Sequence, residues 1–298
     1  MSTRPQEIVQ RRLQPRARWI TLALRWGGEL LAQAVIAVFG FVLALPFLWM
    51  LSTSLKPEGR EFVYPPEWLP NPVRWDNYLT ALTALPFGLY FFHTLVITLS
   101  ALAGTLLTAS LAAFAFARLR FPGREFLFLL VISTLMLPGI VTLIPRFILF
   151  RHLGWIDTFL PLIVPWWFGG GAFNIFLIRQ FFMTLPFDLD DAARIDGASN
   201  FQIYWRVLLP LAKPALATVA VLGFLHHWND FLEPLIYLQS PNNRTVALGL
   251  RGFQDLYHTQ WTLMMAAAAT AIFPVLVLFF VAQRYFVRGI HLTGLAGR

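Results

Sequence analysis

Ionisable side chains within a long apolar stretch are the first candidates for chemistry in this sequence. His226, Asp230 and Glu233 lie in LHHWNDFLEPLIYL (residues 225–238), spaced so that one continuous helix would carry them on one face. Inside a membrane such groups could line a solute pathway, relay protons or, with histidine, ligate a metal. Pro234 and the polar residues after it also fit a water-lined helix end. These interpretations stay open at this point.

A second polar cluster is DDAARIDG, residues 190–197. Asp191 and Asp196 could in principle form a catalytic carboxylate pair. Nothing in the stretch would raise the pKa of a carboxyl group or bind a metal, so general acid–base chemistry is not expected there. No catalytic residue is predicted for this chain, and no metal ligand is assigned, because histidines at helical spacing alone are weak evidence for a metal site.

Motifs for nucleotide hydrolysis and for hydrolytic enzymes are missing. The two lysines, Lys56 and Lys213, follow leucine and alanine, so no Gly-Lys pair and no Walker A loop exists. H-E-x-x-H, G-x-S-x-G and G-x-G-x-x-G are absent, and cysteine is absent as well. The last point excludes a disulfide framework and a thiolate metal site. If ATP drives this protein, another chain must hydrolyse it.

The composition is that of a membrane protein. Apolar residues make up 57% of the 298 and charged residues 13%, whereas soluble domains carry roughly 25% charged residues. The formal net charge of +8 comes from basic residues that stand between apolar runs. At those places they suit phospholipid and topology signals, and nucleic-acid binding is not expected.

Six apolar runs are long enough to cross a bilayer as helices, which need about 20 residues each. The fold class is therefore all-α and polytopic. The runs lie between Glu29 and Lys56, from His93 to Ala117, between Glu125 and Arg146, between Asp157 and Arg179, from about Pro214 to Tyr237, and from about Thr262 to Arg284. Pro138-Gly139 in the third and Gly169, Gly170 and Gly171 in the fourth indicate either broken helices or close helix packing.

Orientation follows from arginine and lysine. If the N-terminus is cytoplasmic, more than twice as many of the 23 basic residues fall inside as outside, as the positive-inside rule requires. The predicted divisions are a basic cytoplasmic tail (1–28), an uncleaved first helix (29–55), an extracytoplasmic loop (56–87), a core of five helices (88–286) with a polar insert (186–214), and a cytoplasmic tail (287–298).

The polar insert is predicted to form two short helices. Asp188 serves as the expected N-cap of the first, which has acidic residues at its positive end and Gly197 as its stop. Ser199 and Gln202 form a capping box for the second helix. Its expected apolar stripe consists of Phe201, Tyr204, Trp205 and Leu208.

The two predicted helices of the insert would have different positions relative to the membrane. The stripe would anchor the second helix at the membrane interface, and the first helix would project into the cytosol. A small, braced, projecting helix suits insertion into a groove of another protein. An ordinary interfacial loop remains the alternative.

The same stretch resembles the EAA loop of ABC importer permeases, E-A-A-x-x-D-G-A followed by P-L-x-x-P. The matching residues are Asp191-Ala192-Ala193, Asp196-Gly197-Ala198, Pro210-Leu211 and Pro214. From about residue 30 to 292 the chain is similar to the carbohydrate-type permeases, of the maltose-system second-subunit kind. Further matching stretches are PFLWMLSTSLKP, FAFARLRFPGRE, LPGIVTLIP, LPLAKPALAT, WNDFLEPLIYL and QRYFVRG.

This resemblance implies a type I importer permease with a cytoplasmic coupling helix in a bacterial or archaeal plasma membrane. It implies a sibling permease, two copies of a cytoplasmic ATPase and an extracytoplasmic solute-binding protein as partners. ATP and Mg would be bound by the ATPase chains, with no cofactor on this chain. The residues that would make or shape the ATPase contact are Asp191, Ala192, Ala193, Asp196, Gly197, Ala198 and Pro210.

The chain departs from the family pattern at two places. Asp191 stands where the family carries glutamate, which puts its contact in doubt but not the docking. His226 and His227 precede Trp228 and Asn229, where relatives mostly carry small or uncharged residues. By the same resemblance Trp228 and Asn229 are candidates to line the pathway, together with Asp230 and Glu233 from the spacing described above.

The expected function is that of a permease subunit in an ATP-driven carbohydrate importer, and not that of an enzyme. A permease for glycerol phosphate or another non-sugar solute is the first alternative. An ion-coupled secondary transporter that uses Asp230 and Glu233 is the second.

Overall fold

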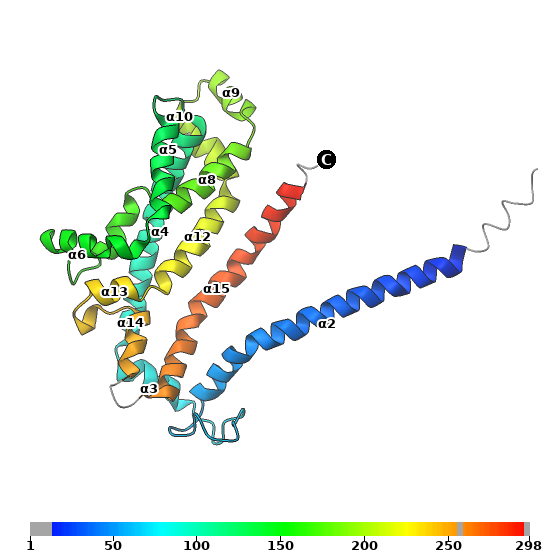
Figure 1. The fold of residues 1–298 in the computed structure, drawn as a ribbon, viewed down its shortest axis with the longest axis vertical. Helices are drawn as coiled ribbons and strands as arrows, with labels where there is room; N and C mark the ends of the chain where they lie inside the picture. Colours follow the sequence, from blue (N-terminus) through cyan, green and yellow to red (C-terminus); the bar gives the residue numbers. More distant parts are fainter. Residues whose placement is uncertain (1–13, 255–258, 295–298) are drawn as a thin grey trace, which may run out of the picture.

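The computed structural model describes residues 14–254 and 259–294, and the described side chains exclude 14–25, 27 and 284–294. Within this part, regular structure is helical apart from one isolated bridge between Gln254 and Thr259. The predicted cytoplasmic tails include residues 1–13 and 295–298, which lie outside the described residues. Figure 1 shows a bundle of helices from which one long helix diverges.

Four segments are long and apolar enough to cross a membrane unaided. They are Gly28–Ser54 in α2 (Gln14–Ser54), Phe87–Arg118 (α4), Trp261–Gln283 in α15 (Trp261–Gly294), and Leu160–Thr184, which consists of α7 (Leu160–Ile163), 3-10 helix η3 (Val164–Trp167) and α8 (Ala172–Thr184). The second span begins six residues before the expected His93, so Phe87 and Gly88 belong to it rather than to a loop.

Two further spans are bent pairs, and the total is six when each pair counts once. The first pair turns by 95° between α5 (Arg124–Ser133) with η1 (Thr134–Met136) and η2 (Gly139–Thr142) with α6 (Leu143–His152). The break falls at Leu137 and Pro138, both extended, because proline disfavours a helical residue before it. The predicted interruption of the third span is confirmed.

The second bent pair turns by 75° where the polar insert meets the fifth span. It joins α10 (Asn200–Gln202), π-helix η4 (Ile203–Leu208) and α11 (Leu209–Leu211) to α12 (Lys213–Trp228). Pro214 stands in the first turn of α12, where its missing N–H costs no intrahelical bond. The span was expected to continue to Tyr237, and this is wrong because α12 ends at Trp228.

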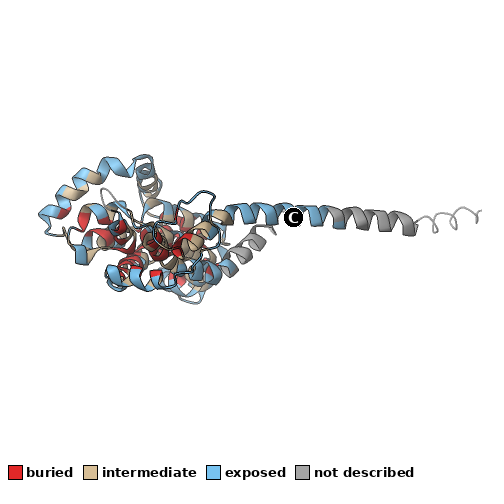
Figure 2. Cartoon of the chain, turned by 90° about the horizontal axis from the view of Figure 1, so that it is seen from below, coloured by how far each residue is buried: buried red, intermediate tan, exposed pale blue. Residues whose placement is uncertain are grey.

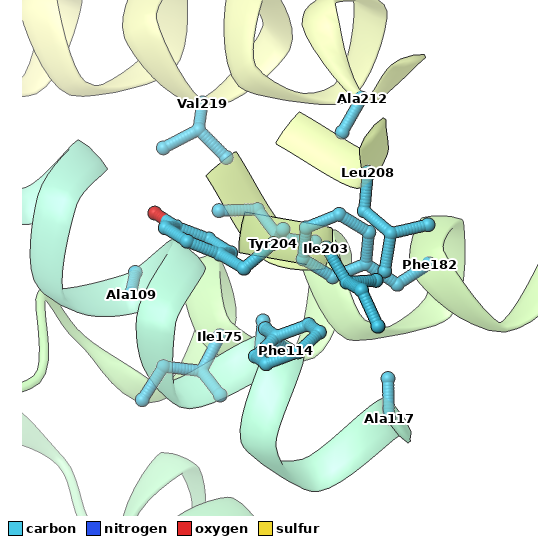
Figure 3. Packing of buried hydrophobic residues seen from close by; sticks show 12 residues of the cluster. Ala109, Phe114, Ala117, Ile175, Phe182, Ile203, Tyr204, Leu208, Ala212 and Val219 are labelled. Atoms are coloured by element: carbon cyan, nitrogen blue, oxygen red, sulfur yellow. The ribbon is translucent and has the colours of Figure 1, made fainter. Parts of the chain in front are cut away.

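The largest apolar core lies where α4, α8 and the insert meet. Tyr204 is buried in it, with its hydroxyl 2.8 Å from Ser110 Oγ on α4. Figure 3 shows the members Ala109, Phe114, Ala117, Ile175, Phe182, Ile203, Tyr204, Leu208, Ala212 and Val219. Fixing the insert to two spans in this way makes it a rigid extension of the bundle.

Glycine brings α4 and the fourth span into close contact. A Cβ on Gly170 would lie 2.7 Å from the carbonyl oxygen of Thr105, and one on Gly104 would lie 2.6 Å from the Trp167 ring. Gly169, Gly170 and Gly171 all have positive φ, which separates η3 from α8. Both sequence interpretations of this stretch, a broken helix and tight packing, are therefore correct.

Helix α2 is the least enclosed part of the chain. The most hydrophobic window of its span has no buried residue, and it meets α15 only where the two converge (Figure 1). In Figure 2 it projects as an exposed rod beyond the buried residues of the bundle.

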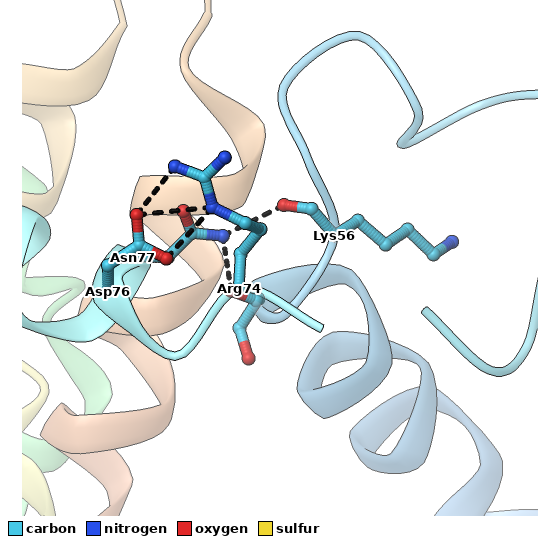
Figure 4. A network of polar contacts seen from close by, with 5 residues as sticks. Lys56, Arg74, Asp76 and Asn77 are labelled. Carbon is cyan, nitrogen blue, oxygen red and sulfur yellow. Dashed lines mark hydrogen bonds and ion pairs between the residues drawn. The ribbon is translucent and has the colours of Figure 1, made fainter. Parts of the chain in front are cut away.

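The segment after α2 is fastened to it by polar contacts. Asn77, in α3 (Asp76–Ala84), donates to the carbonyls of Ser54 and Lys56 at 2.9 and 2.8 Å, and Arg74 pairs with Asp76 at 2.6 Å (Figure 4). The predicted outer loop therefore contains a short helix held against the end of the first span.

Beyond α12 the chain forms short helices that pack on the bundle. These are α13 (Leu232–Tyr237), η5 (Pro241–Asn243), α14 (Val246–Leu250) and η6 (Arg251–Phe253). Asp157 fastens this region to the start of the fourth span. Its carboxylate accepts from the backbone N–H groups of Gln239 and Ser240, from the Ser240 hydroxyl and from Asn243 Nδ2.

Candidate functional site

The projecting helix of the insert is α9 (Asp188–Ile195), which forms a tip of the bundle in Figure 1. Asp188 is its first helical residue and not its N-cap. Phe187 stands at the cap with helical angles, and its carbonyl accepts from the N–H groups of Asp190 and Asp191 at 2.9 and 3.1 Å. The predicted Asp188 cap is wrong, although its carboxylate still lies in the first turn, where the helix dipole favours it.

Gly197 ends α9 as the sequence predicts. It has φ 82°, its N–H donates to Arg194 O at 3.0 Å, and the N–H of Ala198 donates to Ala193 O at 2.9 Å. These two bonds form a Schellman motif, whose left-handed residue is usually glycine. The C-terminal end of α9 is therefore fixed by the backbone itself.

The second helix of the insert begins with the predicted capping box. Ser199 N donates to Gln202 Oε1 at 2.7 Å, and Gln202 N donates to Ser199 Oγ at 3.3 Å. The prediction is confirmed, and it fixes the direction in which the chain leaves α9.

The predicted apolar stripe of this helix divides between two faces. Tyr204 and Leu208 are buried, whereas Phe201 and Trp205 are 64% and 53% exposed. A π-helix bonds residue i to residue i+5, so Ile203 and Leu208 both reach the core and Trp205 turns outward. The prediction that these four residues share one face at α-helical spacing is therefore wrong.

The seven residues predicted to contact an ATPase do not form one surface. Asp191, Ala192, Asp196 and Gly197 are exposed on α9 and the turn that ends it. Ala193 and Ala198 are half-buried against the core, and Pro210 lies in α11 at the start of the bend. Ile195, which no sequence pattern indicated, is 86% exposed at the end of α9.

Asp190 has a role that the sequence did not indicate. Its carboxylate is buried, 3.6 Å from Nη1 of Arg118, the last residue of α4, which is buried too. Burial raises the pKa of Asp190 above its ordinary value, against the opposing effect of Arg118 and Arg194. No sequence pattern indicates this pair, because the two residues lie 72 positions apart.

Arg118 also closes the end of α8. Its Nη2 donates to the carbonyls of Phe182 and Leu185 at 2.7 and 2.8 Å, and its guanidinium lies 4.3 Å from the Phe187 ring centre. The last carbonyls of a helix have no partner within it. One side chain thus joins the ends of α4 and α8 to the start of α9.

Four residues predicted to line a pathway, Trp228, Asn229, Asp230 and Glu233, are each held by other contacts. Trp228 is buried and donates through Nε1 to Ala271 O at 3.0 Å, and Asn229 caps α12. Asp230 accepts from the N–H of Glu233, and Glu233 pairs with Arg146 at 2.8 Å. The prediction that His226, Asp230 and Glu233 share one helical face is wrong, because α12 ends at Trp228 and Glu233 lies in α13. Among the described residues no three histidine or acidic side chains gather as metal ligands would.

A cavity of about 520 Å³ lies between α4, α8 and α12. The lining residues are Thr105, Leu135, Trp166, Gly171, Ala172, Phe173, Asn174, Leu222, Gly223, His226 and His227. The Trp166 ring meets the rings of His226 and His227 at centroid distances of 5.4 and 4.6 Å. Its size and mixture of aromatic and polar groups are usual for a small-molecule site. His226, a pathway candidate from the sequence, and His227 thus both line this space.

A family model described as "Binding-protein-dependent transport system inner membrane component" matches residues 104–292. The chain belongs to this family. The match starts within α4 and includes the cavity, α9 and the bend before α12. The recognition of a binding-protein-dependent permease and its membrane location are therefore confirmed.

Curated relatives match the sequence of this transport component along most of its length. The arabinooligosaccharides transport system permease protein AraQ of Halalkalibacterium halodurans is 34% identical over 89% of the chain and 93% of its own length. The sn-glycerol-3-phosphate transport system permease protein UgpE of Yersinia enterocolitica is 31% identical over 89% and 97%.

A solved structure shares the fold of this transport component. A chain of a bacterial ABC transporter that imports the acidic polysaccharide alginate superposes with a TM-score of 0.76, at 24% identity, over 87% of this chain and 96% of that one. The predicted all-α importer permease fold is confirmed.

Proposed function

We propose that this chain is one of two membrane subunits of an ATP-driven carbohydrate importer. Its partners are a sibling permease, two copies of a cytoplasmic ATPase and an extracytoplasmic solute-binding protein. ATP and Mg belong to the ATPase chains, and no step of the chemistry is assigned to this chain. Family membership and the oligosaccharide relative support this assignment.

The observation that carries the proposal is the build of α9. A helix of eight residues, ended by a Schellman turn and tied to two spans, projects with Asp191, Ala192 and Ile195 exposed. Such a helix fits a groove of a partner protein. The ATPase contact therefore comprises Asp191, Ala192, Asp196, Gly197 and Ile195, with Ala193 and Ala198 shaping it from behind and Pro210 setting the bend.

Orientation in the bacterial or archaeal plasma membrane follows from the same end of the molecule. Arg118 pairs with Asp190 in α9, Arg120 and Arg124 follow Arg118 within six residues, and Arg194 lies in α9 itself. The positive-inside rule therefore puts this end in the cytosol. Both chain ends are cytoplasmic, the loop of residues 56–87 is extracytoplasmic, and residues 88–286 form the core.

The solute pathway is assigned to the cavity rather than to the residues after α12. Trp166, Asn174, His226 and His227 present aromatic faces and hydrogen-bonding groups, as a sugar requires. Trp228 stays a structural residue because its N–H is already bonded to Ala271. Asp230 and Glu233 stay near the pathway without lining the cavity.

The glycerol phosphate relative supports a second candidate substrate. Calorimetry on the cognate solute-binding protein separates the two: a carbohydrate importer predicts binding of an oligosaccharide and no binding of glycerol phosphate. The opposite result replaces the substrate but keeps the permease. Ion-coupled transport is disfavoured because Glu233 is already paired with Arg146.

Purification of the tagged chain from cells that express the whole operon tests the assembly. The proposal predicts a complex with one sibling permease and an ATPase dimer by native mass measurement. Recovery of the chain without any ATPase would contradict it.

A further inference from the structure

The buried ion pair of Arg118 and Asp190 is not part of the proposed docking surface, and its role in the importer needs a separate explanation. The two charged groups lie 3.6 Å apart with side chains 0% and 1% exposed. Arg118 Nε and Nη1 and Asp190 Oδ1 make no hydrogen bond within the described part of the chain. Burying charges in this way is costly, and well-packed apolar residues often give equal or greater stability. Stability alone is therefore a poor reason for this pair.

Few other contacts attach α9 to the membrane spans. Among the ion pairs of the described residues, this one joins α9 to a span, whereas the pair of Asp191 and Arg194 lies within α9. The apolar contact comes from Ala193, half-buried against the core. Short extended or turn segments at Leu185 and Gly197 make the covalent connections. A push on α9 would reach α4 through Asp190, beside the packing of α9 against η4.

Arg118 connects Asp190 of α9 to both α4 and α8, so a displacement of α9 would reach these two helices through it. It is the last residue of α4, a regular helix without internal proline from Phe87 onward. Thr105, thirteen residues earlier, lines the cavity, about 20 Å away along the helix. The other hydrogen bonds of Arg118 hold the C-terminal end of α8, whose first residues Ala172, Phe173 and Asn174 line the same cavity.

We propose that the Arg118–Asp190 pair is the positioning contact through which displacement of α9 moves α4 and α8 together. Arg118 and Asp190 are positioning residues and touch neither nucleotide nor solute. The inference rests on the proposed function, and it assigns the coupling of hydrolysis to transport to a contact inside this chain. Breaking the pair uncouples the two activities and leaves the ATPase docked.

The test uses the complete complex in proteoliposomes, with loaded binding protein outside and ATP inside. Uptake and ATP hydrolysis are measured together, and their ratio is the readout. D190N keeps the size of the side chain and removes its charge. For D190N and for R118Q we expect the ratio of solute imported to ATP hydrolysed to fall about tenfold, while co-purification of the ATPase stays at the wild-type level.

Two further variants keep the test specific. R118K keeps a positive charge beside Asp190, and we expect its ratio to stay within about threefold of wild type, whereas a loss caused only by reshaping the side chain would lower the ratio as much as R118Q does. R120Q is the matched control, because Arg120 is exposed two residues beyond the same end of α4. Its ratio should equal that of wild type.

The outcomes separate the inference from the proposed function. Absence of ATP-dependent uptake in the wild-type complex contradicts the proposed function itself. Wild-type uptake together with an unchanged ratio in both D190N and R118Q overturns the inference alone. Loss of the ATPase from both variants also overturns it, because the pair would then serve to fold α9 for docking.

Discussion

At the residue scale, single polar side chains join segments that are far apart in the sequence. Arg118 reaches Asp190 and Asp157 reaches Ser240 and Asn243. The types of these residues were visible in the sequence, but their partners were not. A carboxylate in a helix's first turn or a loop has many possible partners, and only packing selects one.

Asp157 gives a prediction for pH dependence. Hydrogen bonds from Ser240, Asn243 and Gln239 lower its pKa from 3.8 to about 2. A carboxyl group whose pKa is lower in the folded than in the unfolded chain stabilises the fold at pH values above its unfolded pKa. This contribution is lost as the pH falls through the folded pKa of about 2. We expect D157N to lose about 1–2 kcal/mol, because bonds to an ionised group are strong but solvent screens them here.

Thermal unfolding in detergent checks this expectation. The difference in Tm between wild type and D157N should stay constant from about pH 5 to about pH 8 and shrink below about pH 4. Asparagine tolerates the positive φ of 61° at this position, so the backbone is unaffected. A difference that grows toward acidic pH would contradict the assignment.

At the scale of elements, caps and breakers in the sequence predicted local structure well. The capping box at Ser199, the stop at Gly197 and the break at Pro138 all occur where the sequence put them. Each depends on backbone geometry within a few residues. The π-helix at Ile203–Leu208 and the end of α12 at Trp228 were not predictable, because core packing around Tyr204 and Trp228 decides them.

Gly170 gives a prediction for packing between elements. Its φ of 61° and a Cβ position 2.7 Å from Thr105 O mean that alanine would be strained and would push α4 away. We expect G170A to lower stability by about 2–3 kcal/mol. G88A is the matched control, since a Cβ at Gly88 meets nothing within 4 Å.

Thermal unfolding of both variants provides the comparison. G88A should be as stable as wild type or slightly more so, because alanine favours a helix. Equal Tm values for G170A and wild type would show that the two spans do not need their close approach.

Gly197 tests the shape of α9. A β-branched residue cannot readily adopt φ 82°, so G197V should shift the end of the helix. We expect ATP-dependent uptake to fall by at least about tenfold, a factor that corresponds to a typical coupling free energy. Membrane insertion should be normal, because no Cβ contact occurs at this position. Normal uptake with normal ATPase association would count against a coupling role for the turn.

At the scale of the whole molecule, the number and order of spans could be predicted, since bilayer thickness fixes their length. The family resemblance, including the polar insert, was also present in the sequence. The cavity was not, because its lining comes from residues as distant as Thr105 and His227. Only the folded arrangement of α4, α8 and α12 brings them together.

The cavity predicts a separation of transport from docking. Replacing His226, His227 or Trp166 with alanine should lower the rate of uptake by about three- to tenfold, since each change removes contacts worth about 1 kcal/mol. ATPase association should not change, because none of these residues belongs to α9 or to the turn that ends it. Uptake equal to wild type in all three variants would place the pathway elsewhere.

The central claim is that this chain imports solute only as part of an ATP-driven complex. Uptake of labelled solute into proteoliposomes tests it most directly, with the complete complex compared against this chain alone under an imposed proton or sodium gradient. We predict uptake by the complex that requires internal ATP and loaded binding protein, and none by the chain alone. Gradient-driven uptake by the chain alone, without any ATPase, would contradict the claim.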